Sequence, residues 1–294
     1  MSWRLHRWTW RIESPLFVGM PPAGSVNRAR LYVPARTLWG ALTAELTRHE
    51  AGDAAARAEA YRKVGAWLRE RFRFSYLYPA ERTIGGWRAW LPAYRDRLGL
   101  CWQREDGWPG EPMGDRAFRA RLLHTRPGTA IAAASDTAEE GSLRETECIQ
   151  TRWRDEVGRG RGPVAMVGYV FSRGDADLAR LVPIRTLFVG GDTRYGLGRL
   201  IRDGETEPTQ RLFGAKVNLA DGAPRVVTDR LLAHVPVTDE PALAGDLELL
   251  RGWDRGTIER VAAGEEAPCW RPGSVAHCTV PWCLTAEGYW EANG

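Results

Sequence analysis

A ten-residue segment, 190–199, combines the residue types with which proteins bind phosphate groups. It reads Gly-Gly-Asp-Thr-Arg-Tyr-Gly-Leu-Gly-Arg and follows a hydrophobic segment that looks helical. Glycines let backbone amides approach an anion because no Cβ intervenes, and arginines add charge-assisted hydrogen bonds to phosphate oxygens. The tyrosine ring can stack on a base. The candidate residues are Gly190, Gly191, Arg194, Tyr195, Gly196, Gly198 and Arg199. The alternative is an ordinary glycine-rich turn between a helix and a strand.

The basic side chains of the chain are almost all arginine. Of its 41 lysines and arginines only Lys63 and Lys216 are lysine, so 39 are arginine. Arginine suits bidentate phosphate contacts and stacking on bases, although a GC-rich genome produces the same bias. The net charge is only +4 over 294 residues. Any nucleic-acid surface must therefore be a local patch.

Composition also limits the class of protein. Hydrophobic residues make up 44% and include 14 tryptophans, which is enough apolar material for a core. We find no apolar run long enough to span a membrane and no signal-type N-terminus, so we expect a cytoplasmic protein without membrane contact. The five cysteines fit a reducing compartment.

A zinc site near the end of the chain is an open question from sequence alone. Cys269, His277, Cys278 and Cys283 lie close together in the sequence. Their spacing matches no zinc finger, and adjacent residues of an extended strand point to opposite faces. We therefore assign neither a metal nor a cofactor to this chain.

Periodicity predicts the elements that must position the glycine segment. Alternation over Trp3–Ile12 predicts a strand. Helices are expected from a cap at Thr37 to Arg48 and from Asp53 to Arg73. Residues 85–128 look irregular, with a short helix near Asp115–Leu123.

The second half of the predicted core begins after a hairpin with a mobile tip in residues 129–161. Pro163–Phe171 is a buried strand, and a helix capped by Asp175 runs toward Leu187. Leu197–Ile201 forms the last strand, after the glycine segment. From residue 205 onward we expect short strands and a helix near Gly256–Ala262.

This order of elements predicts an α+β fold. It is the βαββαβ plan of a ferredoxin-like (RRM-like) core with an inserted hairpin, or thumb, and a C-terminal extension. The predicted domains are a core in residues 1–204, with insertions at about 85–162, and an extension or small subdomain in residues 205–294.

Three segments in this order resemble the RAMP superfamily, the ferredoxin-like subunits of CRISPR effector complexes. Ser14–Gly19 followed by Leu31–Leu42 is similar to the family's first strand, loop and helix start. Thr137–Glu147 resembles the base of its thumb hairpin, and Gly190–Arg199 resembles its glycine-rich loop. Within the superfamily, the sequence Thr37–Leu42 resembles the subunits that clamp the 5′ handle of the guide more than it resembles the repeated backbone subunits.

The resemblance implies contacts with guide RNA. The glycine segment would line the RNA backbone, and Arg36 at the start of the first helix would meet a phosphate. The hairpin would reach over the strand with Arg152 and Trp153. The remaining expected RNA contacts, in the loop before the first helix, are Arg28 and Arg30.

Target cleavage by this chain is not expected. The resemblance implies a catalytic aspartate in the loop Gly24–Arg30 of subunits that cut target RNA, but this loop has none and Asn27 stands near that place. An amide cannot serve as a carboxylate base. We name no catalytic residue and predict a non-catalytic, guide-binding subunit of a type III-like CRISPR effector ribonucleoprotein in antiviral defence. Its partners would be guide RNA, other RAMP and large subunits and, indirectly, target RNA.

Two enzymatic alternatives stay open. A metal-independent endoribonuclease that processes CRISPR repeat RNA would need a histidine base, for which His49 and His124 are the candidates. An unrelated α/β enzyme would bind a nucleotide phosphate at the glycine segment. The sequence lacks G-x-x-x-x-G-K-[ST], and its glycines precede a strand where a dinucleotide site would open a helix.

Overall fold

A computed structural model describes residues 2–52, 55–155, 158–220, 222–238, 241–250 and 268–292. These ranges contain four α-helices, one turn of 3-10 helix, two large sheets and three small ones, so the fold is α+β as predicted. The helices are α1 (Ala35–Ala51), α2 (Ala58–Arg71), α3 (Asp115–Leu122) and α4 (Asp175–Leu181), with the 3-10 turn η1 at Thr193–Tyr195. No helix within these ranges is long and apolar enough to cross a membrane.

The main sheet has eleven strands and forms the centre of the molecule. Its strands are β1 (Arg4–Ile12), β3 (Phe72–Phe74), β4 (Tyr78–Thr83), β5 (Gly86–Arg95), β6 (Gly99–Arg104), β7 (Met113–Gly114), β12 (Arg152–Arg154), β13 (Gly160–Ser172), β14 (Thr186–Phe188), β15 (Arg199–Arg202) and β16 (Glu207–Thr209). The continuous path is β14-β15-β1-β13-β4-β5-β6-β7. Within it β1 pairs antiparallel with both β13 and β15, and β13 pairs antiparallel with β4.

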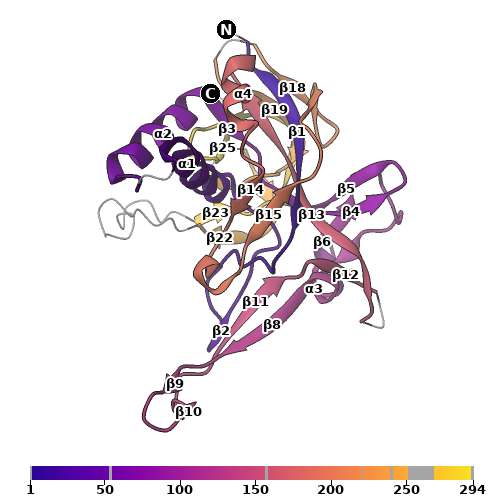
Figure 1. Ribbon diagram of the computed structural model, residues 1–294. Helices are drawn as coiled ribbons and strands as arrows, with labels where there is room; N and C mark the ends of the chain where they lie inside the picture. The colour runs from indigo at the N-terminus through magenta and orange to yellow at the C-terminus, as the bar shows by residue number, and fades with distance from the viewer. Residues whose placement is uncertain are drawn as a thin grey trace.

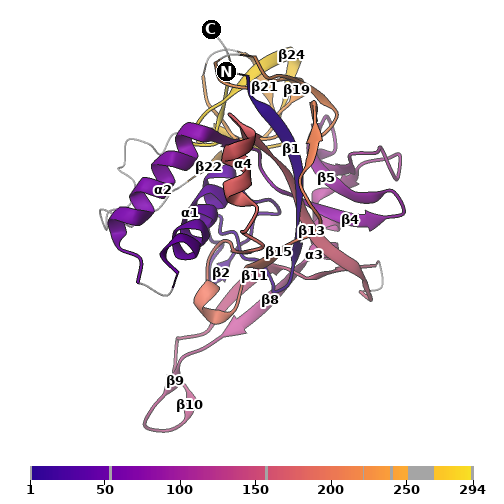
Figure 2. The ribbon, with the colours of Figure 1, turned by 45° about the horizontal axis from the view of Figure 1, so that its top comes forward.

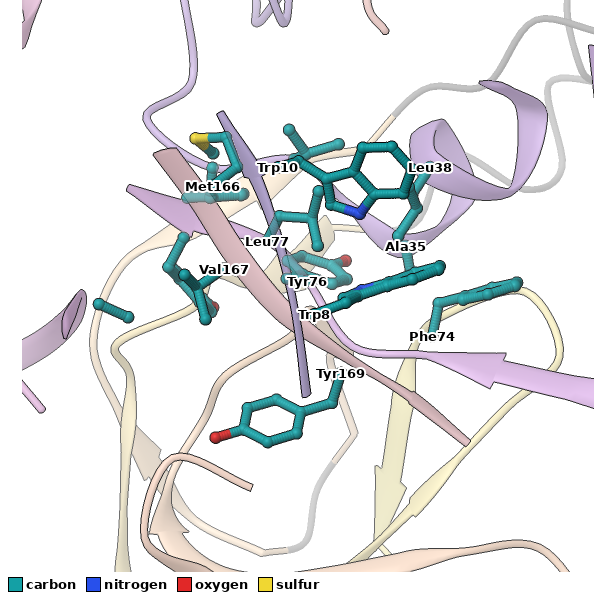
Figure 3. Close-up of a cluster of buried hydrophobic side chains, with 14 of the residues drawn as sticks. Trp8, Trp10, Ala35, Leu38, Phe74, Tyr76, Leu77, Met166, Val167 and Tyr169 are labelled. Atoms are coloured by element: carbon teal, nitrogen blue, oxygen red, sulfur yellow. The ribbon is translucent and has the colours of Figure 1, made fainter. Parts of the chain in front are cut away.

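Alternation along β1 divides its side chains between the two faces of the sheet. Trp8 and Trp10 lie on the face covered by α1, where both are buried beside Leu38 (Figure 3). The Trp8 ring stacks on Phe74 of β3 with centroids 6.0 Å apart. Burial of such large apolar rings anchors β1 beneath the helices.

Helix boundaries differ from the sequence prediction. Helix α1 begins at Ala35, directly after Pro34, so Thr37 lies inside its first turn and does not cap it. Proline suits this place because its fixed φ and missing N–H cost nothing before a helix. Helix α4 ends at Leu181, and Leu187 belongs to strand β14. The glycine segment therefore follows a strand, not a helix.

The region 85–128, expected to be irregular, contains four paired strands, β5, β6, β7 and β8 (Leu123–Gly128). Strands β5 and β6 pair with each other, and β4 joins them to the main sheet. Prolines inside β4 and β5, at Pro79 and Pro92, hid the strand signal, because proline is rare within central strands. The short helix predicted near residue 115 is confirmed as α3.

A long hairpin projects from the body of the molecule (Figures 1 and 2). It is formed by β8 (Leu123–Gly128) and β11 (Arg144–Ile149), and its far end carries β9 (Ile131–Ala132) and β10 (Thr137–Ala138). The short strand β2 (Val26–Asn27) pairs parallel with β11. The predicted hairpin is thus present, but it ends at Ile149 and does not include β12.

The last third of the described chain forms two further sheets. A six-stranded sheet holds β17 (Arg211–Leu212), β18 (Ala215–Asn218), β19 (Arg225–Arg230), β21 (Leu243–Ala244), β24 (Val275–Leu284) and β25 (Trp290–Ala292); a small sheet holds β20 (Val235–Pro236), β22 (Leu247–Leu249) and β23 (Pro268–Trp270). Both contribute to the hydrophobic cluster of the main sheet. The helix predicted near Gly256–Ala262 lies outside the described residues.

Candidate nucleic-acid interface

The glycine segment is the loop that joins β14 to β15. The two strands pair from Thr186 to Phe188, and the loop turns back through η1 between Asp192 and Gly196. Both of these flanking residues have a positive φ, as do Gly190 and Gly198. Left-handed backbone at so many positions requires glycine at most of them.

Two glycines are required for packing. A Cβ at Gly190 would overlap with the carbonyl oxygen of Phe17, and one at Gly198 would overlap with that of Val189. At Gly191 a Cβ would lie 2.9 Å from the Phe17 ring. Gly196, in contrast, faces open space. Close approach of backbone to backbone therefore explains most of the glycine pattern.

The loop amides are largely occupied by internal hydrogen bonds. The amide of Gly191 donates to Phe17 O at 2.9 Å, and that of Gly198 donates to Pro15 O at 2.8 Å. The amide of Gly196 donates to Thr193 O at 3.2 Å. The predicted cradle of free amides for a phosphate is therefore wrong at these three positions, because an amide bonded to a carbonyl is not available to an anion.

Side chains, not amides, are what this loop presents to solvent. Arg194 and Arg199 are exposed, and the Tyr195 side chain is 70% exposed. An exposed ring between two arginines can stack on a base while the guanidinium groups contact phosphates. The recognition chemistry predicted for these three residues is compatible with their exposure.

The loop, the hairpin and the segment after β1 meet at one place. Gly198 bonds to Pro15, and Leu16 forms a bridge with Ile149 at the base of β11. The Arg144 guanidinium on β11 lies 5.0 Å from the Tyr195 ring centroid and 3.9 Å from the Asp192 carboxylate. Parts of the segments that carried the family resemblance thus meet here, namely Pro15–Leu16, the strand β11 and the glycine loop. Thr137 and Ala138 form β10 at the far end of the hairpin, so the expectation that Thr137–Glu147 is the base of the hairpin is wrong for these residues.

Arg144 was not among the predicted site residues. Only one feature of the sequence points to Arg144 as a site residue: it lies in the strand that returns from the hairpin tip. On the neighbouring strand β8, Arg126 is also exposed. Together they extend the basic surface of the loop onto strands β8 and β11 of the hairpin.

The residues predicted before the first helix divide into two groups. Arg28 is half-buried beside β2, within reach of solvent. Arg30 is buried, and its guanidinium pairs with Glu248 at 2.6 Å and donates to the carbonyls of Gly19 and Leu249. The prediction that Arg30 contacts RNA is therefore wrong, since its donors are directed to internal acceptors.

Arg36 lies in the first turn of α1, which the C-terminal region covers. A Cβ at Gly288, in the turn between β24 and β25, would lie 3.2 Å from the Arg36 backbone nitrogen. The helix start is therefore packed against protein, although the Arg36 side chain itself is half-buried. A phosphate contact by this residue stays a prediction.

Trp153 is part of the core and does not reach over a strand. Its side chain is only 2% exposed, and the indole nitrogen donates to Ala80 O at 3.2 Å. The ring packs against Phe118 and Trp90. The predicted stacking of Trp153 on RNA is wrong because inserted segments cover it. Its neighbour Arg152 is exposed.

A buried polar cluster links the two ends of the chain. His234 Nδ1 lies 2.8 Å from the Tyr76 hydroxyl, and its Nε2 lies 3.2 Å from Glu248. Tyr32 donates to the same carboxylate at 2.7 Å. Because the Glu248 carboxylate can only accept, a neutral His234 donates from Nε2 to Glu248 and accepts a hydrogen bond from the Tyr76 hydroxyl at Nδ1.

The pKa shifts agree with this assignment. Burial lowers the pKa of His234, which keeps the ring neutral. Burial alone would raise the pKa of Glu248, but the His234 hydrogen bond and the Arg30 charge outweigh it and lower this pKa to about 2. His234 is fully buried, so this histidine–tyrosine pair cannot reach an RNA substrate. His49 and His124, the candidate bases, are both exposed, without a hydrogen-bond network among the described contacts.

Asn27 is held by its neighbour in the hairpin. Its side-chain amide donates to the Thr146 hydroxyl at 3.4 Å, across the β2–β11 pairing.

Among the described residues no three His, Cys, Asp or Glu side chains are grouped as a metal site. Cys269 lies in β23, whereas His277, Cys278 and Cys283 lie along β24.

Comparison with known proteins identifies a similar fold. No protein-family model matches the sequence, and no curated protein matches it significantly. A chain in the cryo-EM structure of the type III-B Cmr-beta bound to cognate target RNA and AMPPnP superposes with a TM-score of 0.55 at 12% identity, over 92% of this chain and 85% of that one. A chain in the same assembly bound to cognate target RNA gives 0.52 at 14% identity, over 92% and 86%. The resemblance to type III CRISPR effector subunits is therefore confirmed at the level of the fold: this chain has the fold of a chain found in type III-B Cmr-beta.

Proposed function

We propose that this chain is a non-catalytic, guide-RNA-binding subunit of a type III-like CRISPR effector ribonucleoprotein. One observation carries the proposal, the meeting of the β14–β15 loop, the β8–β11 hairpin and the Pro15–Gly19 segment around exposed Tyr195. The structural similarity to Cmr-beta chains supports it. In this role the chain would hold the guide backbone or its 5′ handle and pack against neighbouring subunits in antiviral defence.

We also infer that the centre of the main sheet is a ferredoxin-like core. Its four strands in chain order would be β1, β4, β13 and β15, which lie in the spatial order β15-β1-β13-β4. Helices α1 and α2 connect the first pair, and α4 connects the second. This is the antiparallel arrangement that the βαββαβ plan requires. The boundary near residue 204 stays a prediction.

Recognition of RNA would rest on side chains. Arg194, Arg199 and Arg144 would contact phosphates, Tyr195 would stack on a base, and Arg28 and Arg152 would add charge nearby. Stacking of one base on an aromatic ring is worth about 1–3 kcal/mol. The endoribonuclease alternative lacks an accessible histidine–tyrosine pair among the described residues, because the pair that exists is buried.

The experiment is co-expression with a CRISPR array and the neighbouring genes, followed by purification through this chain and sequencing of the bound RNA. The test variant is Arg194→Ala/Arg199→Ala. The matched control is Arg95→Ala/Arg97→Ala, which removes two exposed arginines, one at the end of β5 and one in the turn that follows it. We expect guides with a common 5′ handle, depleted by the test variant alone. A folded complex without RNA would disprove the proposal.

A further inference from the structure

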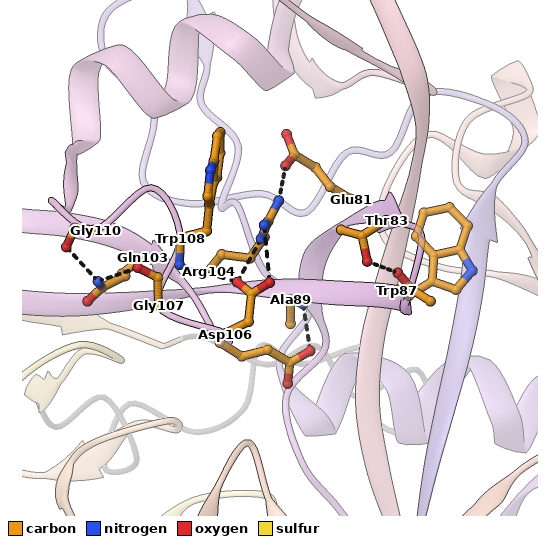
Figure 4. Close-up of polar contacts among 12 residues, drawn as sticks. Glu81, Thr83, Trp87, Ala89, Gln103, Arg104, Asp106, Gly107, Trp108 and Gly110 are labelled. Carbon is orange, nitrogen blue, oxygen red and sulfur yellow. Dashed lines mark hydrogen bonds and ion pairs between the residues drawn. The ribbon is translucent and has the colours of Figure 1, made fainter.

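The turn between β6 and β7 exposes a tryptophan that the RNA-binding surface does not use. Trp108 is 52% exposed and is the only exposed tryptophan in the part of the chain that the structure describes. It follows β6, on the lobe formed by β4, β5 and β6 (Figure 4). Leaving half of an indole in water forfeits a large amount of apolar burial.

The turn that carries Trp108 is fixed by polar contacts. The Gln103 side chain donates to Gly107 O at 3.3 Å and to Gly110 O at 3.0 Å, which closes the turn from inside. The Trp108 amide donates to the Asp106 carboxylate at 3.3 Å. Figure 4 shows this network along the edge of the lobe. The backbone is therefore held in one shape before any partner binds.

The indole itself is also held from two sides. The Arg104 guanidinium lies 4.5 Å from its ring centroid, and Trp90 meets it edge to face at 6.2 Å. Arg104 is in turn fixed by two bonds to Asp106, at 2.8 and 3.1 Å, and by Glu81 at 3.3 Å. A rigid aromatic side chain loses little entropy on binding, and buried tryptophans dominate the energy of many protein interfaces.

Charge distinguishes between the possible partners of Trp108. Arg104 is the only basic residue between positions 103 and 114; Asp106 pairs with it, and Glu81 pairs with both Arg104 and Arg121. The exposed Glu111 carboxylate is negative, whereas a group that binds the RNA backbone must be positive. The two arginines and the carboxylates of Glu81, Asp106 and Glu111 give this surface no excess of positive charge for a phosphate backbone, whereas the exposed Glu111 would attract a protein surface with a basic rim.

We propose that Trp108 is the anchor of a protein–protein interface, which inserts into an apolar pocket of a neighbouring subunit with a basic side chain near Glu111. This inference rests on the proposed function for the identity of the neighbour as a subunit of the effector complex. It concerns a surface separate from the loop and hairpin that would bind the guide.

The test uses the complex obtained by co-expression, purified through a tag on this chain. Trp108 is replaced by the photo-reactive p-benzoylphenylalanine, and the irradiated complex is treated with nuclease before denaturing electrophoresis and mass spectrometry. The same probe at Leu98 is the matched control, because Leu98 is 49% exposed at the other end of β6. We expect a nuclease-resistant cross-link from position 108 to one identified subunit, and none from position 98.

Two variants measure the strength of the contact. Trp108→Ala should lower the affinity for the cross-linked subunit about 30-fold, as expected for a central aromatic anchor. Glu111→Lys should weaken it without touching the indole, and a Trp108→Phe variant should retain part of the affinity. Thermal melting checks that each variant is folded.

The outcomes separate this inference from the proposed function. Guide RNA is recovered from the same purification, so a complex that holds guide RNA but gives no cross-link at position 108 overturns only the interface. A nuclease-sensitive cross-link from position 108 would make Trp108 an RNA contact and overturn the interface as well. A cross-linked subunit in a complex without RNA would support the interface and contradict the guide-binding role.

Discussion

The guanidinium group of Arg144 lies 5.0 Å from the ring centroid of Tyr195, and this contact joins the hairpin to the glycine loop. The two residues come from elements that are distant in sequence but share one exposed surface. A cation over an exposed aromatic ring contributes about 0.5–1 kcal/mol, enough to bias how the ring is held. The contact makes the β8–β11 hairpin and the loop one candidate binding unit.

Removal of either partner should weaken RNA binding in a coupled way. Tyr195→Ala should cost about 1–3 kcal/mol of binding free energy, the value of one stacked base. Arg144→Ala should cost less, and the double variant should cost less than the sum, because each residue supports the other. Fluorescence anisotropy with labelled single-stranded RNA at fixed salt measures all three. If the loss of binding free energy in the double variant equals the sum of the two single losses within about 0.5 kcal/mol, the coupling is contradicted.

The two glycines at the end of the loop should respond differently to alanine. Gly198→Ala should destabilise the fold by about 2–4 kcal/mol, because it adds a clash with Val189 O to the cost of a left-handed residue. Gly196→Ala meets open space and should cost only about 1–2 kcal/mol. Urea unfolding gives both values. Equal losses of unfolding free energy in the two variants would show that the structure relaxes around the Cβ at position 198 without strain.

Burial of Trp153 predicts an effect on stability and not on recognition. Trp153→Ala removes a core ring and its hydrogen bond to Ala80 and should cost about 3–5 kcal/mol. Its exposed neighbour serves as the control, since Arg152→Ala should leave stability within about 0.5 kcal/mol of the wild type. Chemical denaturation distinguishes the two. A fully stable Trp153→Ala variant with reduced RNA affinity would restore the stacking role.

The buried cluster around Glu248 should make the fold sensitive to acid. The pKa of Glu248 falls to about 2 in the folded state, so its stabilisation is present above the unfolded value of about 4.3 and is lost as the pH falls toward 2. The lowered pKa of His234 acts in the same direction below about 6.5, because the unfolded chain then takes up the proton first.

Urea unfolding measured between pH 7 and pH 3 tests this sign. Wild-type stability should fall steadily with pH. Glu248→Gln should be less stable at pH 7 and show a flatter profile below pH 5, because the group that titrates there is gone. A variant profile parallel to the wild type would mean that Glu248 does not carry the acid sensitivity.

Much of the fold was predictable because its signals are local. Strand β1, strand β13 and helix α3 lie where alternation and turn residues placed them. Strands β4 and β5 were missed because Pro79 and Pro92 interrupt their strand signal and because consecutive residues of both strands are buried, which removes the alternation. Leu187 was assigned to a helix because a short apolar run fits a helix or a strand equally well.

The site was predictable in its residue types but not in its geometry. Arg194, Tyr195 and Arg199 are exposed and their contact with RNA stays a prediction, whereas Gly190, Gly191 and Gly198 pack closely against Phe17 and Val189. Arg30 and Trp153 were assigned to RNA because their tertiary partners, Glu248 and Ala80, are far away in sequence. Burial by distant segments leaves no local trace in the sequence.

The most direct test of the central claim is ultraviolet cross-linking of the purified complex, with mass spectrometry of the peptides that carry nucleotides. The account predicts a cross-link between Tyr195 and a guide nucleotide, lost in Tyr195→Ala and kept in the Arg95→Ala/Arg97→Ala control. Guide cross-links confined to other parts of the chain, with none in residues 190–199 or in the β8–β11 hairpin, would contradict it.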